Sequence, residues 1–237
     1  MPRIALVAAL KREIAPLVRE WTMEVRDYDK RKFTFFVRSD AVAVCGGIGA
    51  EAARRATQAA IELYQPETVV SVGFVGALVP ELRVGDVVVP SRVVDSRDGS
   101  SWTCDGGKGI LVSAMHVTDA HGKQELAKAY SACAVDMEAA AVAQGASPRG
   151  LKFAAVKAVS DELNFVVPTV ETAITSDGRF HAGCFLLYVT VRPWLWARVV
   201  RLGRDSHRAS AALALALRAI LETREAATKN ESPREWK

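Results

Sequence analysis

The 237-residue chain has little cysteine, and no two of its four cysteines stand in the spacing C-x-x-C. Wide spacing of this kind excludes a zinc knuckle and a redox dithiol, and it favours a reducing compartment such as the cytoplasm. The four histidines form no ligand pattern such as H-E-x-x-H. We therefore expect no metal and no cofactor, with phosphate as the one conceivable co-substrate.

Long apolar runs are also absent. No stretch approaches the roughly 18 to 20 apolar residues that a spanning helix needs, and the nearest, Phe185 to Val191, ends at Arg192 and Pro193. The apolar run from Ile4 to Leu10 is followed at once by charged residues, without the cleavage region of a secretory signal. We expect a cytoplasmic protein with no transmembrane span.

Several motifs of common enzymes are missing. The sequence contains no Walker loop, no G-x-G-x-x-G after its first strand and no G-x-S-x-G, which argues against nucleoside triphosphate hydrolysis, NAD chemistry and a serine hydrolase. The formal net charge is only +4, from 31 basic and 27 acidic residues. Because no RNA-binding motif accompanies this small excess, we expect no nucleic-acid partner.

The sequence that is present alternates between strand and helix patterns. Hydrophobic residues make up 50% and charged residues 24%, as in a globular chain. Apolar runs that predict strands span 4–9, 33–37, 41–45, 68–75, 86–94, 109–114, 132–137 and 153–160. Helical patterns span 11–21, 50–64, 119–130, 138–146 and 206–226. The alternation predicts an α/β fold, a single three-layer domain with a central mixed β-sheet flanked by helices.

The end of the chain divides into a helix and a tail. Leu213, Leu217 and Leu221 follow one another at four-residue steps, which indicates a helix face that packs on the core. The last residues are polar and include Pro233. We expect the domain to span 1–226 and the tail 227–237 to be disordered.

Five sequence blocks carry a family resemblance that covers most of the chain. They read IALVAALKREIAPL, VAVCGGIGAEAARRAT, VSVGFVGALVPELRVGDVVVP, AVDMEAAAVAQ and VKAVSDELN. In this order they resemble the methylthioadenosine/S-adenosylhomocysteine nucleosidases of the purine nucleoside phosphorylase superfamily, and VDMEAAA followed by VSD is the most specific pair. The resemblance implies a nucleoside phosphorylase/hydrolase-like fold and an enzyme that cleaves the N-glycosidic bond of a purine nucleoside, with adenine as the expected base.

The resemblance also implies roles for particular residues. Asp161 matches the general acid that protonates the purine at N7, so that the base leaves neutral. Glu13 matches the catalytic glutamate that orients and deprotonates water. Glu138 matches the residue that holds the ribose hydroxyls, with Met137 against the sugar. The substrate-binding residues implied in this way are Glu138, Met137, Phe74, Lys157 and Ser160.

The chain departs from the family at several of these positions. Phe74 stands in the turn where the family has a Ser or Thr hydroxyl, and Lys157 replaces an arginine, which keeps the charge but loses the planar fork. The loop 112–119 lacks the family's stacking phenylalanine. The stretch from Pro90 to Gly109 is shorter than in the family and 164–204 is longer. Such changes are expected if the base is kept and the rest of the substrate differs.

The segment 185–204 interleaves tryptophan and arginine. It resembles hopanoid-associated members of the superfamily, which implies an adenosyl-linked lipid as substrate and a peripheral membrane contact. Trp194 and Trp196 would then line an apolar channel or sit on the membrane surface. An amphipathic helix whose aromatics pack on the sheet is the simpler interpretation of the same residues.

Several alternatives stay open from the sequence. The nucleophile is water or phosphate: Glu13 favours water because a carboxylate repels phosphate, whereas Arg54, Arg55 or Lys157 could meet an anion. A non-catalytic nucleoside-binding protein on the same fold is the first alternative function, and a membrane-surface module built on 185–204 is the second. Because family members are homodimers or larger, we expect a homo-oligomer.

Overall fold

The structure is a computed structural model, and it describes residues 3–165 and 193–231. Its strands are β1 (Ile4–Ala8), β2 (Thr22–Tyr28), β3 (Arg31–Val37), β4 (Ala41–Cys45), β5 (Thr68–Ala77), β6 (Val87–Val88), β7 (Arg92–Asp95), β8 (Ser101–Thr103), β9 (Ile110–Ser113), β10 (Ala134–Asp136) and β11 (Lys152–Asp161). Its helices are α1 (Lys11–Val18), α2 (Ala50–Tyr64), α3 (Ala120–Tyr130), α4 (Ala139–Ala146) and α6 (Pro193–Glu231), with a 3-10 turn at Ser147–Arg149.

The strands of the described chain form one mixed sheet. Their order is β2-β3-β4-β1-β5-β10-β9-β7-β8, and β11 pairs with β5 and β6 beside this path. Strand β1 runs parallel to β4 and β5, and β11 runs parallel to β5, whereas β10 is antiparallel to β5. Because the carboxyl ends of β1, β5 and β11 therefore meet at one edge, the residues that follow these strands come together.

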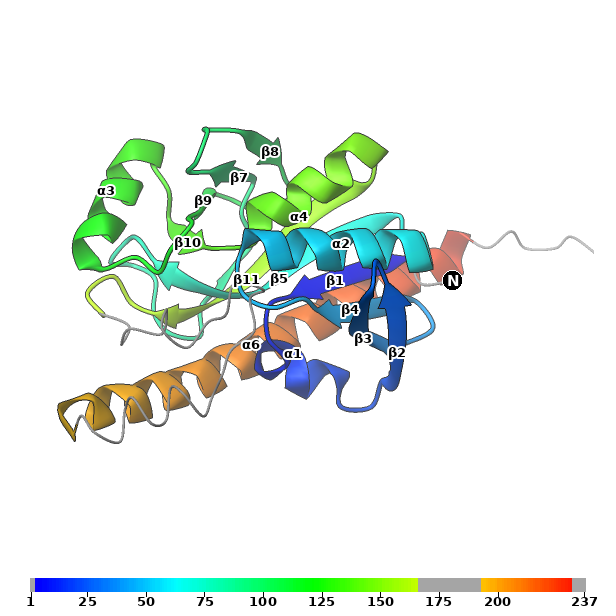
Figure 1. Cartoon of the computed structure of the whole chain (residues 1–237), viewed down its shortest axis with the longest axis horizontal. Helices are drawn as coiled ribbons and strands as arrows, with labels where there is room; N and C mark the ends of the chain where they lie inside the picture. Colours follow the sequence, from blue (N-terminus) through cyan, green and yellow to red (C-terminus); the bar gives the residue numbers. More distant parts are fainter. Residues whose placement is uncertain (1–2, 166–192, 232–237) are drawn as a thin grey trace, which may run out of the picture.

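Helices cover both faces of the sheet (Figure 1). On one face α2 and α4 pack against each other and against β1 and β5, and on the other α1 packs against α6, which also contacts β11. Each interface has its own cluster of buried apolar side chains, rich in alanine beneath α2 and α4 and in leucine and isoleucine beneath α1 and α6. The three-layer α/β domain predicted from the sequence is confirmed.

The structure differs from the strand predictions at three places. The run 86–94 is not one strand, because Pro90 lies in a gap between β6 and β7 and a proline offers no N–H to a sheet ladder. Strands β2 and β8 are not predicted from the sequence. Most side chains of β2 are exposed, so the apolar alternation that predicts a half-buried strand is absent, and β8 has only three residues.

Helix α6 is longer than predicted, since it begins at Pro193 and ends at Glu231 rather than spanning 206–226. Leu213, Leu217 and Leu221 are buried, which confirms their role in the core. In Figure 1 the first turns of α6 extend beyond the sheet. Within the described ranges, no helix is both long and apolar enough to cross a membrane.

Part of the predicted tryptophan and arginine segment, 185–192, lies outside the described residues, as do the side chains of Trp194 and Trp196. The end of the tail, 232–237, lies outside them as well. The domain boundary at residue 226 and the membrane contact of this segment therefore stay predictions.

Candidate active site

A cavity of about 180 Å³ lies at the sheet edge where β1, β5 and β11 end. Six of the seven residues predicted for the site line it, namely Glu13, Phe74, Met137, Glu138, Ser160 and Asp161. Other lining residues include Arg12, Ile48, His116, Lys123, Asp136 and Leu202. The fold thus gathers side chains from opposite ends of the sequence around one small space.

Glu13 comes from the first turn of α1 and is 6% exposed. Its Oε2 accepts the backbone N–H groups of Ala9 and Leu10, each at 3.0 Å, so the carboxylate also completes the start of the helix. Burial raises the pKa of Glu13, although these N–H groups and the ammonium of Lys157 oppose the rise. Gly73 gives the carboxylate room, because a Cβ there would stand 3.0 Å from Oε2.

Glu138 follows β10 and stands at the N-cap position of α4. Its Oε1 accepts the N–H of Gly49 at 2.8 Å and its Oε2 accepts the N–H of Met137 at 3.3 Å. Burial, followed by the charge of Asp136, raises the pKa of Glu138 to about 7. The carboxyl therefore keeps its proton to a higher pH than an ordinary glutamate, and it adjoins the loop at the start of α2.

Lys157 is the predicted site residue that does not line the cavity. It is 1% exposed, and its Nζ lies 2.8 Å from Asp136 Oδ2 beneath the cavity. Burial lowers the pKa of Lys157, but the carboxylates of Asp136, Glu138 and Glu13 outweigh burial and raise it overall. The arrangement makes Lys157 a counter-charge for the surrounding acids and does not place it in contact with the space for a substrate.

Asp136 is held on several sides. In addition to Lys157, it accepts Ser113 Oγ at 2.6 Å on Oδ1 and the N–H of Ala139 at 2.9 Å on Oδ2. Ser113 Oγ in turn accepts the N–H of Ala140 at 2.9 Å. This network fixes the turn from β10 into α4, and that turn presents Met137 and Glu138 to the cavity.

Asp161 ends β11 and carries two side-chain contacts. Ser160 Oγ donates to its Oδ1 at 2.8 Å, and Lys123 Nζ lies 2.5 Å from its Oδ2. Lys123 belongs to α3, is 2% exposed and also donates to the carbonyl oxygen of Glu162 at 2.9 Å. Nothing in the sequence pointed to Lys123, because one lysine in a polar helix is ordinarily solvated.

Arg54 and Arg55, considered in the sequence as anion contacts, do not line the cavity. Both donate to Glu51 on α2, with N···O distances of 2.5 to 2.9 Å. Phe74 and His116 do line it, in the turn that lacks a hydroxyl and in the loop that lacks the family's phenylalanine. The described residues include no group of three or more acidic, His or Cys side chains placed to hold a metal ion.

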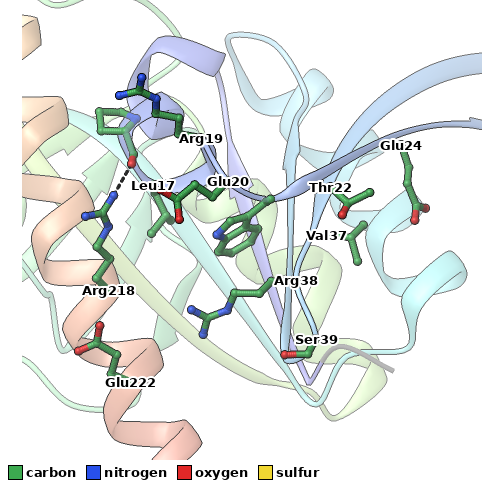
Figure 2. A pocket seen from close by; sticks show the side chains of 12 residues that line it. Leu17, Arg19, Glu20, Thr22, Glu24, Val37, Arg38, Ser39, Arg218 and Glu222 are labelled. Atoms are coloured by element: carbon green, nitrogen blue, oxygen red, sulfur yellow. Dashed lines mark hydrogen bonds between the residues drawn. The ribbon is translucent and has the colours of Figure 1, made fainter.

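A larger cavity of about 1040 Å³ lies between α1, the β2–β3 hairpin and α6. Figure 2 shows its lining, in which Arg218 donates to the carbonyl oxygen of Pro16 at 2.6 Å. Arg38 lies over the Trp21 ring, 5.6 Å from its centre. None of the residues predicted for catalysis lines this cavity, so its size does not make it the active site.

The chain thus has an α/β fold with a cavity lined by carboxyl groups at one edge of its sheet. Residues 3–108 and 110–179 match the family model described as the phosphorylase superfamily. The chain belongs to this superfamily, as the sequence blocks predicted. The family match covers the stretches that supply Glu13, Phe74, Glu138 and Asp161.

Named relatives agree with the family match. The chain is similar to 5'-methylthioadenosine/S-adenosylhomocysteine nucleosidase of Marinomonas sp., with 35% identity over 40% of this chain and 42% of that protein. It is 25% identical to the nucleosidase of the same name from Shewanella baltica over 78% of this chain and 94% of that one. The prediction of an enzyme in the nucleosidase or nucleoside phosphorylase class is confirmed.

Solved structures share the fold. Futalosine hydrolase of Helicobacter pylori superposes with a TM-score of 0.70 and 15% identity, covering 94% of this chain and 98% of that one. S-adenosylhomocysteine nucleosidase of Streptococcus pyogenes, in complex with 5-methylthiotubericidin, has a TM-score of 0.70 and 19% identity over 93% of this chain and 96% of that one.

Proposed function

We propose that the chain hydrolyses the N-glycosidic bond of an adenine nucleoside. The observation that carries this proposal is the convergence of three carboxyl groups, Glu13, Glu138 and Asp161, on one cavity of about 180 Å³. Cleavage of this bond makes the sugar cationic and the base anionic at the same time. The reaction therefore needs an acid at the base, and negative charge together with a nucleophile at the sugar.

The three carboxyl groups divide these tasks. Asp161 delivers a proton to N7 of the purine, and Ser160 holds its other oxygen. Glu138, in its ionised form, accepts hydrogen bonds from the ribose hydroxyls and stabilises the oxocarbenium ion. Glu13 orients a water molecule and removes its proton, a role for which a raised pKa suits a base at neutral pH.

Water is the nucleophile in this proposal. Glu13 stands on the nucleophile side, where a carboxylate repels phosphate. Phe74 occupies the place of the family's hydroxyl, and Arg54 and Arg55 are engaged with Glu51 outside the cavity. The named relatives support adenine as the base, because methylthioadenosine and S-adenosylhomocysteine are both adenine nucleosides.

An apolar or lipid-linked 5' substituent is a second candidate feature of the substrate, and one contact favours it. Leu202 of α6 lines the cavity. A substituent that leaves the cavity along α6 would meet this apolar side chain. The homo-oligomer, the cytoplasmic location and the absence of a cofactor stay predictions.

The test is release of adenine from methylthioadenosine, adenosine and an adenosyl-linked lipid, with and without phosphate. We expect adenine and the free sugar without phosphate, and ¹⁸O from labelled water at C1 of the sugar. Strict dependence on phosphate, with a sugar 1-phosphate as product, would overturn hydrolysis and leave a phosphorylase. Activity on the lipid alone would identify the 5' substituent.

The Asp161→Asn variant separates an enzyme from a non-catalytic binding protein. We expect it to lose about 10²- to 10⁴-fold in kcat while ligand affinity is largely kept. Asp105→Asn is the matched control, because Asp105 is exposed and lies outside the cavity. Nucleoside binding without measurable turnover in the unmodified protein would favour the binding protein instead.

A further inference from the structure

Lys123 of α3 forms a buried ion pair with Asp161, the residue proposed as the acid for the leaving base. Lys123 lines the cavity, and its Nζ lies 2.5 Å from Asp161 Oδ2 and 2.9 Å from the carbonyl oxygen of Glu162. With 2% of its surface exposed, Lys123 is almost completely removed from bulk water. Burying an ammonium is unfavourable unless a partner compensates, and here the partner is the carboxyl proposed to act as the acid.

Each carboxyl oxygen of Asp161 faces a donor in this arrangement. Its Oδ1 accepts the Ser160 hydroxyl and its Oδ2 faces the Lys123 ammonium, so both oxygens act as acceptors. An ammonium carries three N–H donors, so the contact of Lys123 with Oδ2 brings a transferable proton to the carboxyl group. The proton that the pair can transfer is then on Lys123 Nζ.

The surroundings leave space for this contact. A Cβ at position 76 would stand 2.9 Å from Asp161 Oδ2 and 3.2 to 3.3 Å from Lys123 Cε and Nζ. Gly76 therefore allows the carboxylate and the ammonium to meet next to the β5 strand. The second bond of Lys123, to Glu162, holds the ammonium at the end of β11 and directs it toward Asp161.

We propose that Lys123 supplies, through Asp161, the proton that the leaving purine takes up. The inference rests on the proposed function. As the C1'–N9 bond breaks, its electron pair passes to the purine, and N7 takes a proton from Asp161 Oδ2. Asp161 receives one proton from Lys123 Nζ, which becomes a neutral amine. Glu13 removes a proton from the attacking water, and exchange with solvent restores the ammonium of Lys123 and the carboxylate of Glu13.

The first experiment compares two leaving groups. A 4-nitrophenyl riboside with the same 5' group as the purine nucleoside leaves as a stable anion and needs no proton. We expect Lys123→Ala to lower kcat for the purine nucleoside by about 10²- to 10⁴-fold and for the nitrophenyl riboside by less than about threefold. Lys128→Ala is the matched control, since Lys128 is exposed on the same helix. Equal losses on both substrates would show a structural role and overturn the proposal.

The second experiment adds small cations to the Lys123→Ala variant and uses the purine nucleoside only. Ethylammonium carries a transferable proton and should restore part of the rate, whereas tetramethylammonium has the charge without the proton and should not. Restoration by both would show that charge alone matters, and restoration by neither would also count against a proton supplied at this place.

Two measurements keep the outcomes separable. If Lys123→Ala does not fold, Lys123→Gln keeps an N–H donor toward Asp161 and should show the same loss on the purine substrate, with circular dichroism reporting the fold. If the unmodified protein releases no purine with or without phosphate, the proposed function has failed. If it does release purine and the lysine variants match it in rate, only the role of Lys123 has failed.

Discussion

Two buried lysine–aspartate pairs stand side by side in the functional region, and they differ in what covers the carboxylate. Beneath the cavity, the Lys157 and Asp136 side chains are 1% and 0% exposed, whereas in the cavity wall those of Lys123 and Asp161 are 2% and 10% exposed. Asp136 is also held by Ser113 and the N–H of Ala139. Both aspartates line the cavity, but only Asp161 has exposed side-chain surface.

The same residue types therefore serve different ends. In the lower pair Asp136 borders the cavity but has no exposed side-chain surface, and the pair supports the turn that carries Glu138 and balances the surrounding acids. The wall pair is open toward the space where a substrate fits, so its proton can leave. The difference lies in access from the cavity, and it can be tested by breaking each pair in turn.

The largest effect is expected from Lys157→Met. The change leaves Asp136 as an unpaired carboxylate in the protein interior, which should lower the free energy of unfolding by about 3 to 5 kcal/mol. Urea unfolding followed by circular dichroism measures the loss. Adding Asp136→Asn should recover much of it, because the two side chains act as one unit. If Lys157→Met alone were as stable as the unmodified protein, the Lys157–Asp136 pair would not be needed for stability.

The next effect is a pH dependence of stability centred on Glu138. Its pKa is about 7 in the folded protein against an ordinary value of 4.5, so the folded state binds more protons than the unfolded state between these values. Stability is therefore lost as pH rises through this window, by roughly 2 to 3 kcal/mol. Thermal unfolding from pH 4.5 to 8 checks this, and Glu138→Gln should flatten the slope. A slope of the opposite sign would contradict the raised pKa.

A smaller loss is expected from Lys123→Met. Water in the cavity can reach the Asp161 carboxylate once its partner is gone, so the free energy of unfolding should fall by about 1 to 2 kcal/mol, less than for the closed pair. The two lysine variants should be unfolded in urea under identical conditions. Equal losses would mean that access from the cavity does not distinguish the pairs.

The smallest effect is expected at an exposed ion pair, which gives the baseline for both buried ones. Arg3 donates to Glu67 at 2.8 and 2.9 Å, with side-chain exposures of 48% and 61%. Arg3→Met should change the free energy of unfolding by less than about 1 kcal/mol, and the difference should shrink as salt is added. A loss as large as that of Lys157→Met would show that burial does not determine how much an ion pair contributes to the free energy of unfolding.

Much of the fold could be predicted from local patterns, because buried strands appear as short apolar runs and amphipathic helices as apolar residues at helical spacing. The Ala50 to Tyr64 helix has the predicted bounds, and the strands at Ile4 and Ala41 begin where expected. Strands β2 and β8 and the early start of α6 were not predicted. In β2 the side chains are mostly exposed, and the interleaved arginines of α6 blur its apolar stripe.

The candidate site also has a part that the sequence predicts and a part that it does not. The sequence by itself determined the three acids, Glu13, Glu138 and Asp161, because each lies in a block whose residue pattern resembles the family. Only the tertiary structure decided their surroundings: Lys157 lies under the cavity with Asp136, and Lys123 reaches Asp161 from a helix 38 positions earlier in the chain. The physical reason is that an ion pair between distant residues leaves no periodic signal in sequence. It is set by which strand ends and helices the sheet order brings together, and by how far water can reach them.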